Sequence, residues 1–255
     1  MIAPRDHHPP AAMIVAGGHG RRMARTHAVP KPLVPLAGIP LIEIVVRKCL
    51  RAGFRPVTLA LGHAAEEILA HVRGCGDLAQ DEISSVIESE PLGTAGALSL
   101  LDAWRGTQLL VNGDLLSAID LEQMLERHRR WQADLTIAVH FESHRLELGE
   151  VVTADEERVT DYLEKPLKQY RISSGTYLLE PSMCELIPCG QAIDVPDLVH
   201  GAVRAGRRVF AHVHGRPWID VNDAALRGRA EQMLCASPEI FGVDRARVLR
   251  ERSVS

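Results

Sequence analysis

Several features that would place this chain in a familiar class are absent from its sequence. The five cysteines never form Cys-x-x-Cys and no histidines have the H-E-x-x-H spacing, so neither a zinc site nor a disulfide framework is indicated. No apolar run reaches the roughly 18 residues of a membrane-spanning helix. The opening segment MIAPRDHHPP lacks the apolar stretch of a signal peptide. We therefore expect reduced thiols, no membrane partner and a cytoplasmic location.

Aromatic residues are scarce as well. They make up 4% of the chain against 46% hydrophobic residues in total, so the core is expected to be aliphatic. The net charge of −4 leaves no basic excess for nucleic acid, although a locally basic pocket for an anionic substrate remains open. No internal repeat is present, and the absence of hexapeptide repeats argues against an appended β-helix. A length of 255 residues fits one α/β domain.

Apolar segments of strand and helix length alternate through the first half of the chain. Strands are predicted at 13–16, 56–61, 83–88 and 109–111, and helices at 41–52, 64–72, 94–104 and 121–131. Strands that alternate with helices of this length predict a mainly parallel sheet covered by helices.

The second half changes character. Strands are predicted at 135–140, 149–153, 158–164, 172–179 and 208–213, and helices at 194–205 and 224–235. The short turns between the first four of these strands indicate an antiparallel or mixed extension of the sheet. We therefore predict a flexible N-terminal tail at 1–11, a single domain at 12–236, and a C-terminal helix or tail at 237–255.

A glycine loop between residues 13 and 38 is the most informative segment. Its cations and glycines are Gly17, Gly18, Gly20, Arg21, Arg22 and, within Pro30-Lys31-Pro32, Lys31. Backbone N–H groups and fixed positive charges of this kind bind polyphosphates. The loop matches neither G-x-G-x-x-G, because Met23 stands at the third glycine, nor a Walker loop. A plain glycine turn is the alternative.

Polar clusters follow the predicted strands, where open parallel sheets bind their ligands. They lie at 17–22, 88–96, 113–114, 164–166 and 218–223. Asp114 and Asp220, together with a polyphosphate, could hold Mg²⁺, which prefers oxygen ligands. Taken singly, each aspartate is slightly better explained as a turn or N-cap residue.

Two further clusters suggest substrate contacts. Glu164-Lys165-Pro166 places an acceptor for hydroxyls beside a cation for a phosphate, and in isolation an exposed ion pair at a strand end explains it equally well. Thr94 stands among small residues that permit close approach of a flat ring, and it could also cap a helix.

These motifs, in this order, resemble the sugar-phosphate nucleotidylyltransferases, which make nucleoside-diphosphate sugars. The resemblance covers roughly residues 13–235. It rests on Ala16-Gly17-Gly18-His19-Gly20-Arg21-Arg22, Pro30-Lys31-Pro32, Pro91-Leu92-Gly93-Thr94-Ala95-Gly96, Gly113-Asp114, Gly149-Glu150-Val151-Val152, Glu164-Lys165-Pro166, Ser174-Gly175-Thr176-Tyr177 and Trp218-Ile219-Asp220.

The resemblance implies a Rossmann-like nucleotide-diphospho-sugar transferase fold with a mixed, mainly parallel sheet and no C-terminal β-helix. It implies Mg²⁺-dependent attack of a sugar 1-phosphate on the α-phosphorus of a nucleoside triphosphate. The catalytic residues would be Arg22 and Lys31, and the metal ligands Asp114 and Asp220. The nucleotide would contact Ala16, Gly17, Gly18, Gly20, Arg21, Glu90, Gly93, Thr94 and Gly113. The sugar phosphate would contact Gly149, Glu164, Lys165, Gly175 and Thr176.

Substrate identity is less determined. The Glu-x-x-x-Gly-Thr-Ala-Gly form near residue 90 looks like guanylyltransferases for mannose and heptose phosphates, and the short length is similar to relatives acting on cyclitol phosphates such as valienol 1-phosphate. GTP is the expected nucleotide, with UTP, dTTP, ATP and CTP open. Arg21, Ser174 and Asn222-Asp223 depart from the usual family pattern and suggest an unusual sugar or cyclitol.

Two other functions stay open. A non-catalytic subunit that senses nucleotide sugars would typically lack the loop arginine, the lysine or a metal aspartate. A glycosyltransferase of related fold would carry Asp-x-Asp, whereas Asp114 is followed by Leu115-Leu116. Homo-oligomers are common in the family, and the sequence does not decide the oligomeric state.

Overall fold

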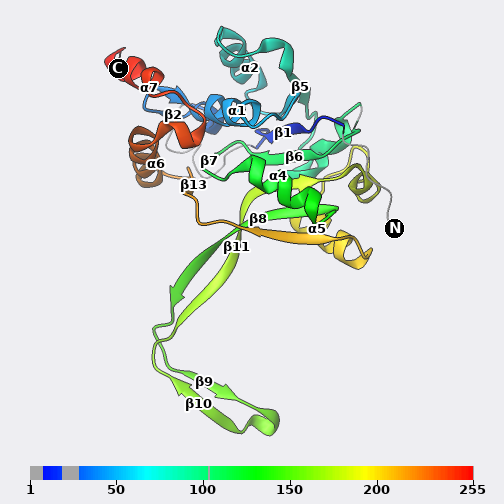
Figure 1. Cartoon of the computed structure of the whole chain (residues 1–255), viewed down its shortest axis with the longest axis vertical. Coiled ribbons are helices and arrows are strands. Elements are labelled where there is room, and N and C mark those ends of the chain that lie inside the picture. Colours follow the sequence, from blue (N-terminus) through cyan, green and yellow to red (C-terminus); the bar gives the residue numbers. More distant parts are fainter. Residues whose placement is uncertain (1–7, 19–28, 103, 255) are drawn as a thin grey trace.

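A computed structural model describes residues 8–18, 29–102 and 104–254 of the chain (Figure 1). The strand β1 (Ala11–Val15) already begins within the predicted N-terminal tail, at its last residue. Gly20, Arg21 and Arg22, which the sequence assigns to the site, lie outside the described residues.

A mixed sheet forms the centre of the molecule. Within the described residues it has seven strands in the order β12-β8-β11-β6-β1-β4-β5. Their bounds are β1, β4 (Val57–Leu61), β5 (Ile83–Ile87), β6 (Gln108–Asn112), β8 (Leu135–Arg145), β11 (Leu167–Leu179) and β12 (Val209–Val213). Only β11 runs antiparallel to its neighbours, β6 and β8, among these described strands. The predicted mainly parallel α/β sheet is confirmed.

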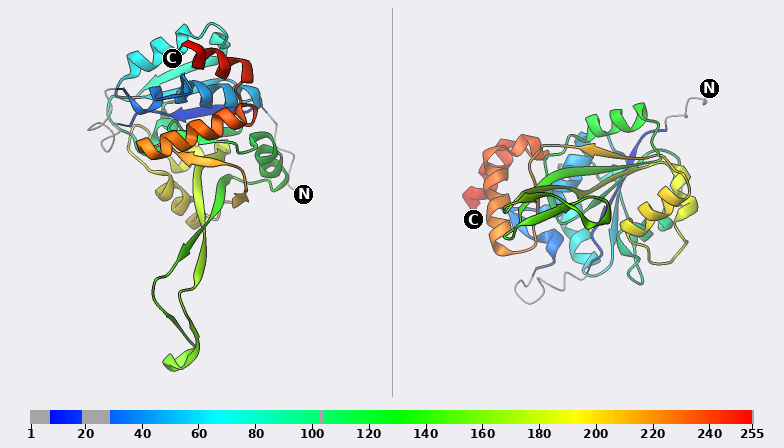
Figure 2. Two further views of the ribbon diagram at one scale, coloured as in Figure 1. Left: turned by 90° about the vertical axis from the view of Figure 1, so that its left-hand side faces the viewer. Right: turned by 90° about the horizontal axis from the view of Figure 1, so that it is seen from below.

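Helices cover both faces of this sheet (Figure 2). They are α1 (Leu41–Arg51), α2 (Ala65–Gly74), α3 (Gly93–Gly96), α4 (Leu121–Arg130), α5 (Val195–Arg204), α6 (Ala224–Ala236) and α7 (Arg245–Val254). Alternation along β1 explains the two layers of core. Ala12 and Ile14 pack into one hydrophobic cluster with α1, whereas Met13 belongs to a second cluster with α5. Among the described residues, no helix is both long and apolar enough to cross a membrane.

Two short ribbons stand beside the sheet. The strands β2 (Pro35–Leu36) and β3 (Ile39–Pro40) form one antiparallel pair. The strands β7 (Leu115–Ser117) and β13 (Trp218–Asp220) form the other, with Asp220 opposite Leu115. This second ribbon places the segment after β6 beside the segment after β12.

A long β-arm leaves the body of the molecule. The outer halves of β8 and β11 continue beyond the sheet and lead to the paired strands β9 (Glu150–Thr153) and β10 (Val159–Leu163) (Figures 1 and 2). The arm exposes Phe141, Leu146, Leu148, Val151, Val159, Tyr162, Leu163, Leu167 and Tyr170. The strands β8 and β11 are therefore longer than the strands predicted at 135–140 and 172–179.

One predicted helix is largely wrong. Instead of a helix over 94–104, the chain forms α3, only four residues long, and a 3-10 turn at Ala97–Leu100. Glycines at both ends of α3 weaken the helix, and Gly93 adopts a φ of +75° that favours glycine. An added Cβ at Gly96 would lie 2.8 Å from the Gln191 carbonyl oxygen, so packing also demands a glycine here.

The end of the chain is helical. A 3-10 turn at Pro238–Phe241 leads into α7, and Val248 of that helix is 3% exposed within the core cluster around α1. The C-terminal segment is thus held to the body through this buried side chain.

Candidate active site

The carboxyl ends of β1 and β6 lie side by side and open into a cavity. Parallel pairing sets Val15 opposite Asn112, and the Gly113 amide donates to the Val15 carbonyl at 2.8 Å. The cavity has a volume of about 190 Å³. It is lined by Val15, Ala16, Gly18, Lys31, Pro32, Thr94, Asn112, Gly113 and Asp114. Four of these residues belong to the predicted nucleotide-binding set, namely Ala16, Gly18, Thr94 and Gly113, and Lys31 and Asp114 were predicted as a catalytic residue and a metal ligand.

Close backbone approach explains two of the glycines. An added Cβ at Gly17 would lie 3.0 Å from Glu88 Oε2 and 3.1 Å from the Gly62 amide nitrogen. At Gly113 it would lie 3.0 Å from the Val15 carbonyl oxygen. Burial raises the pKa of Glu88, whose carboxylate lies beside Gly17. Glu88 was not among the predicted site residues, although it directly follows β5.

Lys31 stands at the centre of the polar contacts. It begins a 3-10 turn, Lys31–Leu33, between two prolines that restrict the backbone. Its Nζ donates to Asp114 Oδ2 at 3.0 Å and to Asn222 Oδ1. The side chain is 16% exposed, so the ammonium group is held in place and still open to the cavity. Asn222 is a site residue that the sequence noted only as a departure from the family pattern.

The ribbon of β7 and β13 brings Asp114 and Asp220 together. Asp220 pairs with Leu115, the residue after Asp114, and the Val221 amide donates to the Asp114 carbonyl at 3.1 Å. Two carboxylates and the amide oxygen of Asn222 form an all-oxygen donor set, which suits Mg²⁺. The residues present thus fit the predicted metal.

A second, larger cavity is lined in part by β13. Its volume is about 520 Å³. It is lined by His140, Phe141, Glu142, His214, Gly215, Arg216, Trp218, Ile219, Asp220, Leu226 and Arg229. Asp220 is on its wall, whereas Asp114 is on the wall of the first cavity. Arg216 and Arg229 give this cavity two cations that an anion could contact, beside the carboxylates of Glu142 and Asp220.

Ser174 organises the inner wall of the second cavity. Its hydroxyl group lies 2.9 Å from His140 Nδ1 and 2.8 Å from His214 Nε2. Its carbonyl accepts a 2.8 Å hydrogen bond from Trp218 Nε1, and the Trp218 ring stacks on His140 with centroids 4.7 Å apart. Burial lowers the pKa of His214 to about 4, helped by the nearby charges of His140 and His212. His214 is therefore neutral at neutral pH.

Other predicted residues have clear structural partners. Gly175 has a φ of +64°, and an added Cβ would lie 3.0 Å from Asn112 Nδ2. Thr176, next to it, is 1% exposed. The Thr94 hydroxyl donates to Asp194 Oδ1 at 3.0 Å and accepts from the Val195 amide at 2.9 Å. Thr94 thus both joins α3 to α5 and lines the first cavity.

The structure does not bring the predicted sugar-phosphate residues of the arm to these cavities. Gly149 directly precedes β9, and Glu164 and Lys165 directly follow β10 (Figure 1). The Lys165 carbonyl accepts a 3.1 Å hydrogen bond from Arg145 Nη1, also on the arm. These strands pair only with each other in the described part of the chain, so their ends are not at the edge of the central sheet. Glu90 is exposed.

The low pKa of His214 predicts a specific loss of stability in acid. Its folded pKa of about 4 lies below the ordinary 6.5, so the unfolded chain binds a proton that the folded protein does not. The free energy of unfolding should therefore fall as the pH drops from 6.5 toward 4. In urea unfolding at pH 7.5 and pH 5, His214→Gln should lose less stability than the wild type, whereas His200→Gln, at an exposed position of α5, should behave like the wild type. Equal losses in all three proteins would contradict the assignment.

Comparisons with known proteins agree with this geometry. The family model described as "Nucleotidyl transferase" matches residues 11–224. Mannose-1-phosphate guanylyltransferase of Mycobacterium tuberculosis is 30% identical over 248 residues, which is 92% of this chain and 68% of that protein. UTP–glucose-1-phosphate uridylyltransferase of a Synechocystis species is 29% identical over 242 residues, 85% of this chain and 62% of that protein.

The fold has solved counterparts as well. HddC of Yersinia pseudotuberculosis, crystallised with GMP-PN, superposes with a TM-score of 0.68 at 23% identity, covering 88% of this chain and 99% of that one. That likeness concerns the fold alone. The family match spans all seven strands of the described sheet and both strands of the ribbon formed by β7 and β13. The chain therefore belongs to the nucleotidyl transferase family, among the sugar-1-phosphate nucleotidyltransferases.

Proposed function

We propose that this protein transfers a nucleoside monophosphate from GTP to a sugar or cyclitol 1-phosphate, releasing pyrophosphate. The observation that carries the proposal is the position of Lys31, on the wall of the smaller cavity, between Asp114 and Asn222, while Asp220 lines the larger cavity. The smaller cavity, with its glycine loop, suits a triphosphate. The larger one, with two arginines, suits a second anion.

The chemistry requires two anions to be brought into line. An oxygen of the sugar 1-phosphate attacks the α-phosphorus, the new P–O bond forms, and the bond to the β-phosphate oxygen breaks as pyrophosphate leaves. No protein nucleophile takes part. Lys31 would neutralise charge on the phosphate oxygens, and the amides around Gly17 and Gly18 would orient the triphosphate. Asp114 and Asp220 would hold Mg²⁺, which when bound offsets the charge that develops on the phosphates.

The second cavity supports the assignment of the acceptor. A sugar or cyclitol ring can lie against the indole of Trp218, while Arg216 and Arg229 attract its phosphate group. Glu164 and Lys165, which the family resemblance assigns to the sugar phosphate, lie on the arm and remain a prediction. Asp220, on the wall of this cavity, would mark the side from which the acceptor approaches.

The choice of GTP rests on one sequence segment and one relative. The segment from Glu90 to Gly96 has the form seen in guanylyltransferases, and the relative from Mycobacterium tuberculosis carries that activity in its name. The Synechocystis relative is named for UTP, which makes UTP the first competitor.

A substrate matrix tests the function directly. Purified protein is mixed with GTP, UTP, dTTP, ATP or CTP and with mannose, heptose, glucose or valienol 1-phosphate, and pyrophosphate release is measured with and without Mg²⁺. We expect Mg²⁺-dependent release for at least one pair, with GTP the fastest nucleotide. Tight binding of a nucleotide sugar without any pyrophosphate release would identify a sensor instead. Consumption of a nucleotide sugar with transfer of its sugar would identify a glycosyltransferase.

Removal of the central cation should slow the reaction. Lys31→Ala is expected to lower kcat by about 100-fold, the effect of losing one positioned electrostatic group. Arg204→Ala, which removes an exposed cation on α5, is the matched control and should leave kcat unchanged. Steady-state pyrophosphate release measures both. A Lys31→Ala protein with wild-type kcat would remove Lys31 from the mechanism.

The arginines of the second cavity should act on one substrate only. Arg216→Ala and Arg229→Ala are each expected to raise the KM for the sugar 1-phosphate by about 10-fold, the loss of one charge-assisted contact, with little change in the KM for GTP. Separate titrations of the two substrates measure this. An equal rise in both constants would contradict the assignment of this cavity to the acceptor.

A further inference from the structure

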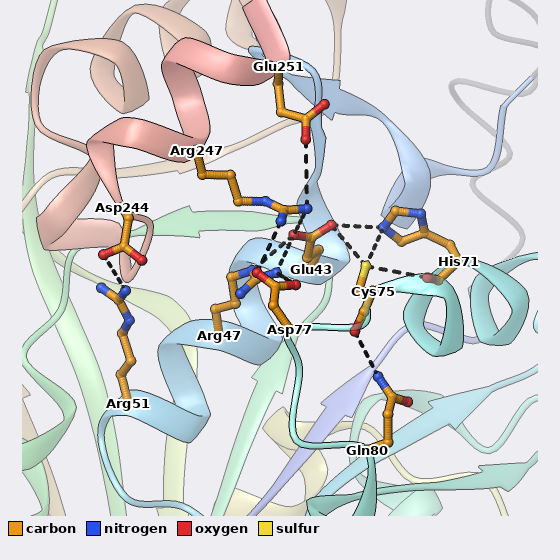
Figure 3. Close-up of polar contacts among 10 residues, drawn as sticks. All are labelled: Glu43, Arg47, Arg51, His71, Cys75, Asp77, Gln80, Asp244, Arg247 and Glu251. Carbon is orange, nitrogen blue, oxygen red and sulfur yellow. Dashed lines mark hydrogen bonds and ion pairs between the residues drawn. The ribbon is translucent and has the colours of Figure 1, made fainter.

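A buried carboxylate lies outside the candidate active site, between α1, α2 and α7 (Figure 3). Glu43 of α1 is 0% exposed, so its charge must be met by neighbouring side chains. Its Oε1 lies 2.8 Å from Arg47 Nη2 and 2.7 Å from Arg247 Nη2, the latter on α7. The two arginines thus occupy one oxygen of the carboxylate and hold it in a fixed orientation.

The other oxygen faces two side chains of a different kind. Glu43 Oε2 lies 3.0 Å from His71 Nε2 and 3.2 Å from Cys75 Sγ, and these two atoms are 3.6 Å apart. His71 is on α2, and Cys75 is the residue that caps the end of this helix. The two residues are one helical turn apart, so both side chains lie on the same face of the helix. Nitrogen, sulfur and oxygen donors therefore converge on one point (Figure 3).

We propose that Glu43, His71 and Cys75 bind Zn²⁺. The distances favour this ion. Tetrahedral Zn²⁺, with bonds of about 2.0–2.1 Å to nitrogen and oxygen and about 2.3 Å to sulfur, separates its ligand atoms by roughly 3.3–3.6 Å. The three observed separations are within a few tenths of an ångström of that range, so small side-chain movements suffice. His71 has a side chain 29% exposed to solvent, which leaves room for a water as fourth ligand.

The local charge also favours a divalent cation. Arg47 and Arg247 face three carboxylates, those of Glu43, Asp77 and Glu251. The cluster therefore carries one surplus negative charge while the thiol is protonated. The neighbouring pair of Arg51 and Asp244 is balanced by itself. Zn²⁺ that displaces the thiol proton would add one positive charge in total and neutralise the cluster.

The resting state of the thiol determines how binding depends on pH. Burial, followed by the charge of Glu43, raises the pKa of Cys75 to about 12, so the thiol is protonated and donates to Glu43 Oε2. Zn²⁺ must displace that proton, because thiolate is the ligand. Binding should release one proton and strengthen as the pH rises. Mg²⁺ and Ca²⁺, which prefer oxygen ligands alone, should not compete.

The sequence carried only a faint signal for this site. His71 and Cys75 have the i, i+4 spacing of a helical ligand pair, but no Cys-x-x-Cys motif accompanies them in the sequence. Glu43 comes from another helix, 28 residues before His71. Only the packing of α2 on α1 places it there.

The test uses the full chain without nucleotide, so that its result does not depend on the proposed activity. Zn²⁺ is titrated in a Cys184→Ser/Cys189→Ser background, which removes the two exposed thiols. We expect one Zn²⁺ per chain, and Co²⁺ in its place should give the thiolate-to-cobalt charge-transfer absorption. Cys75→Ser and His71→Ala should each weaken binding by at least about 10-fold. Cys235→Ser, the matched control, should bind as the background does.

A second measurement covers variants that fail to fold. The rate at which Cys75 is alkylated in the wild-type chain is measured by mass spectrometry of the modified peptide. Zn²⁺ should lower this rate by at least about 10-fold, while Cys235 keeps its rate. Mg²⁺ should give no protection. Equal alkylation of Cys75 with and without Zn²⁺, or unchanged Zn²⁺ affinity in folded Cys75→Ser, would overturn the proposal.

Discussion

The burial of β1 on both faces is the constraint on which the rest of the structure depends. Ala12, Met13 and Ile14 are all 0% exposed, and they alternate between two hydrophobic clusters. A strand of this kind must have a parallel neighbour on each side and a helical layer on each face. With β4 and β6 as those neighbours, the segments after β1 and β6 emerge at the same edge, and the first cavity opens there.

Charged side chains lie together at that edge of the sheet. The rigid Pro30-Lys31-Pro32 segment presents one ammonium group, which contacts the carboxylate of Asp114, just before β7, and the amide oxygen of Asn222, just after β13. Since a triphosphate and a sugar phosphate are both anions and repel each other, a fixed cation on the wall of the first cavity would help to bring them together for nucleotidyl transfer. The contacts of Lys31 with Asp114 and Asn222 hold its side chain in place before any substrate binds.

The β-arm differs from the central sheet in its strand pairing and in its exposure to solvent. Its strands β9 and β10 have no partner beyond each other among the described residues, and its apolar side chains are exposed. A two-stranded ribbon gains little stability of its own in water. The residues that the family resemblance assigns to the sugar phosphate, Glu164 and Lys165, lie next to this ribbon, and Arg216 and Arg229 instead line the larger cavity.

Local pattern determined much of this protein. The alternation of apolar strands and helices predicted the mainly parallel sheet, and the order of motifs from Gly17 to Asp220 indicated the family. The sheet prediction depends on short-range periodicity, which each segment carries by itself, and the family resemblance depends on the order of the motifs along the chain. The tertiary structure alone decided that Lys31 meets Asn222, 191 residues later, that Glu43 faces His71 and Cys75, and that the arm leaves the sheet. These contacts depend on how separate elements pack, and a single segment does not contain that information.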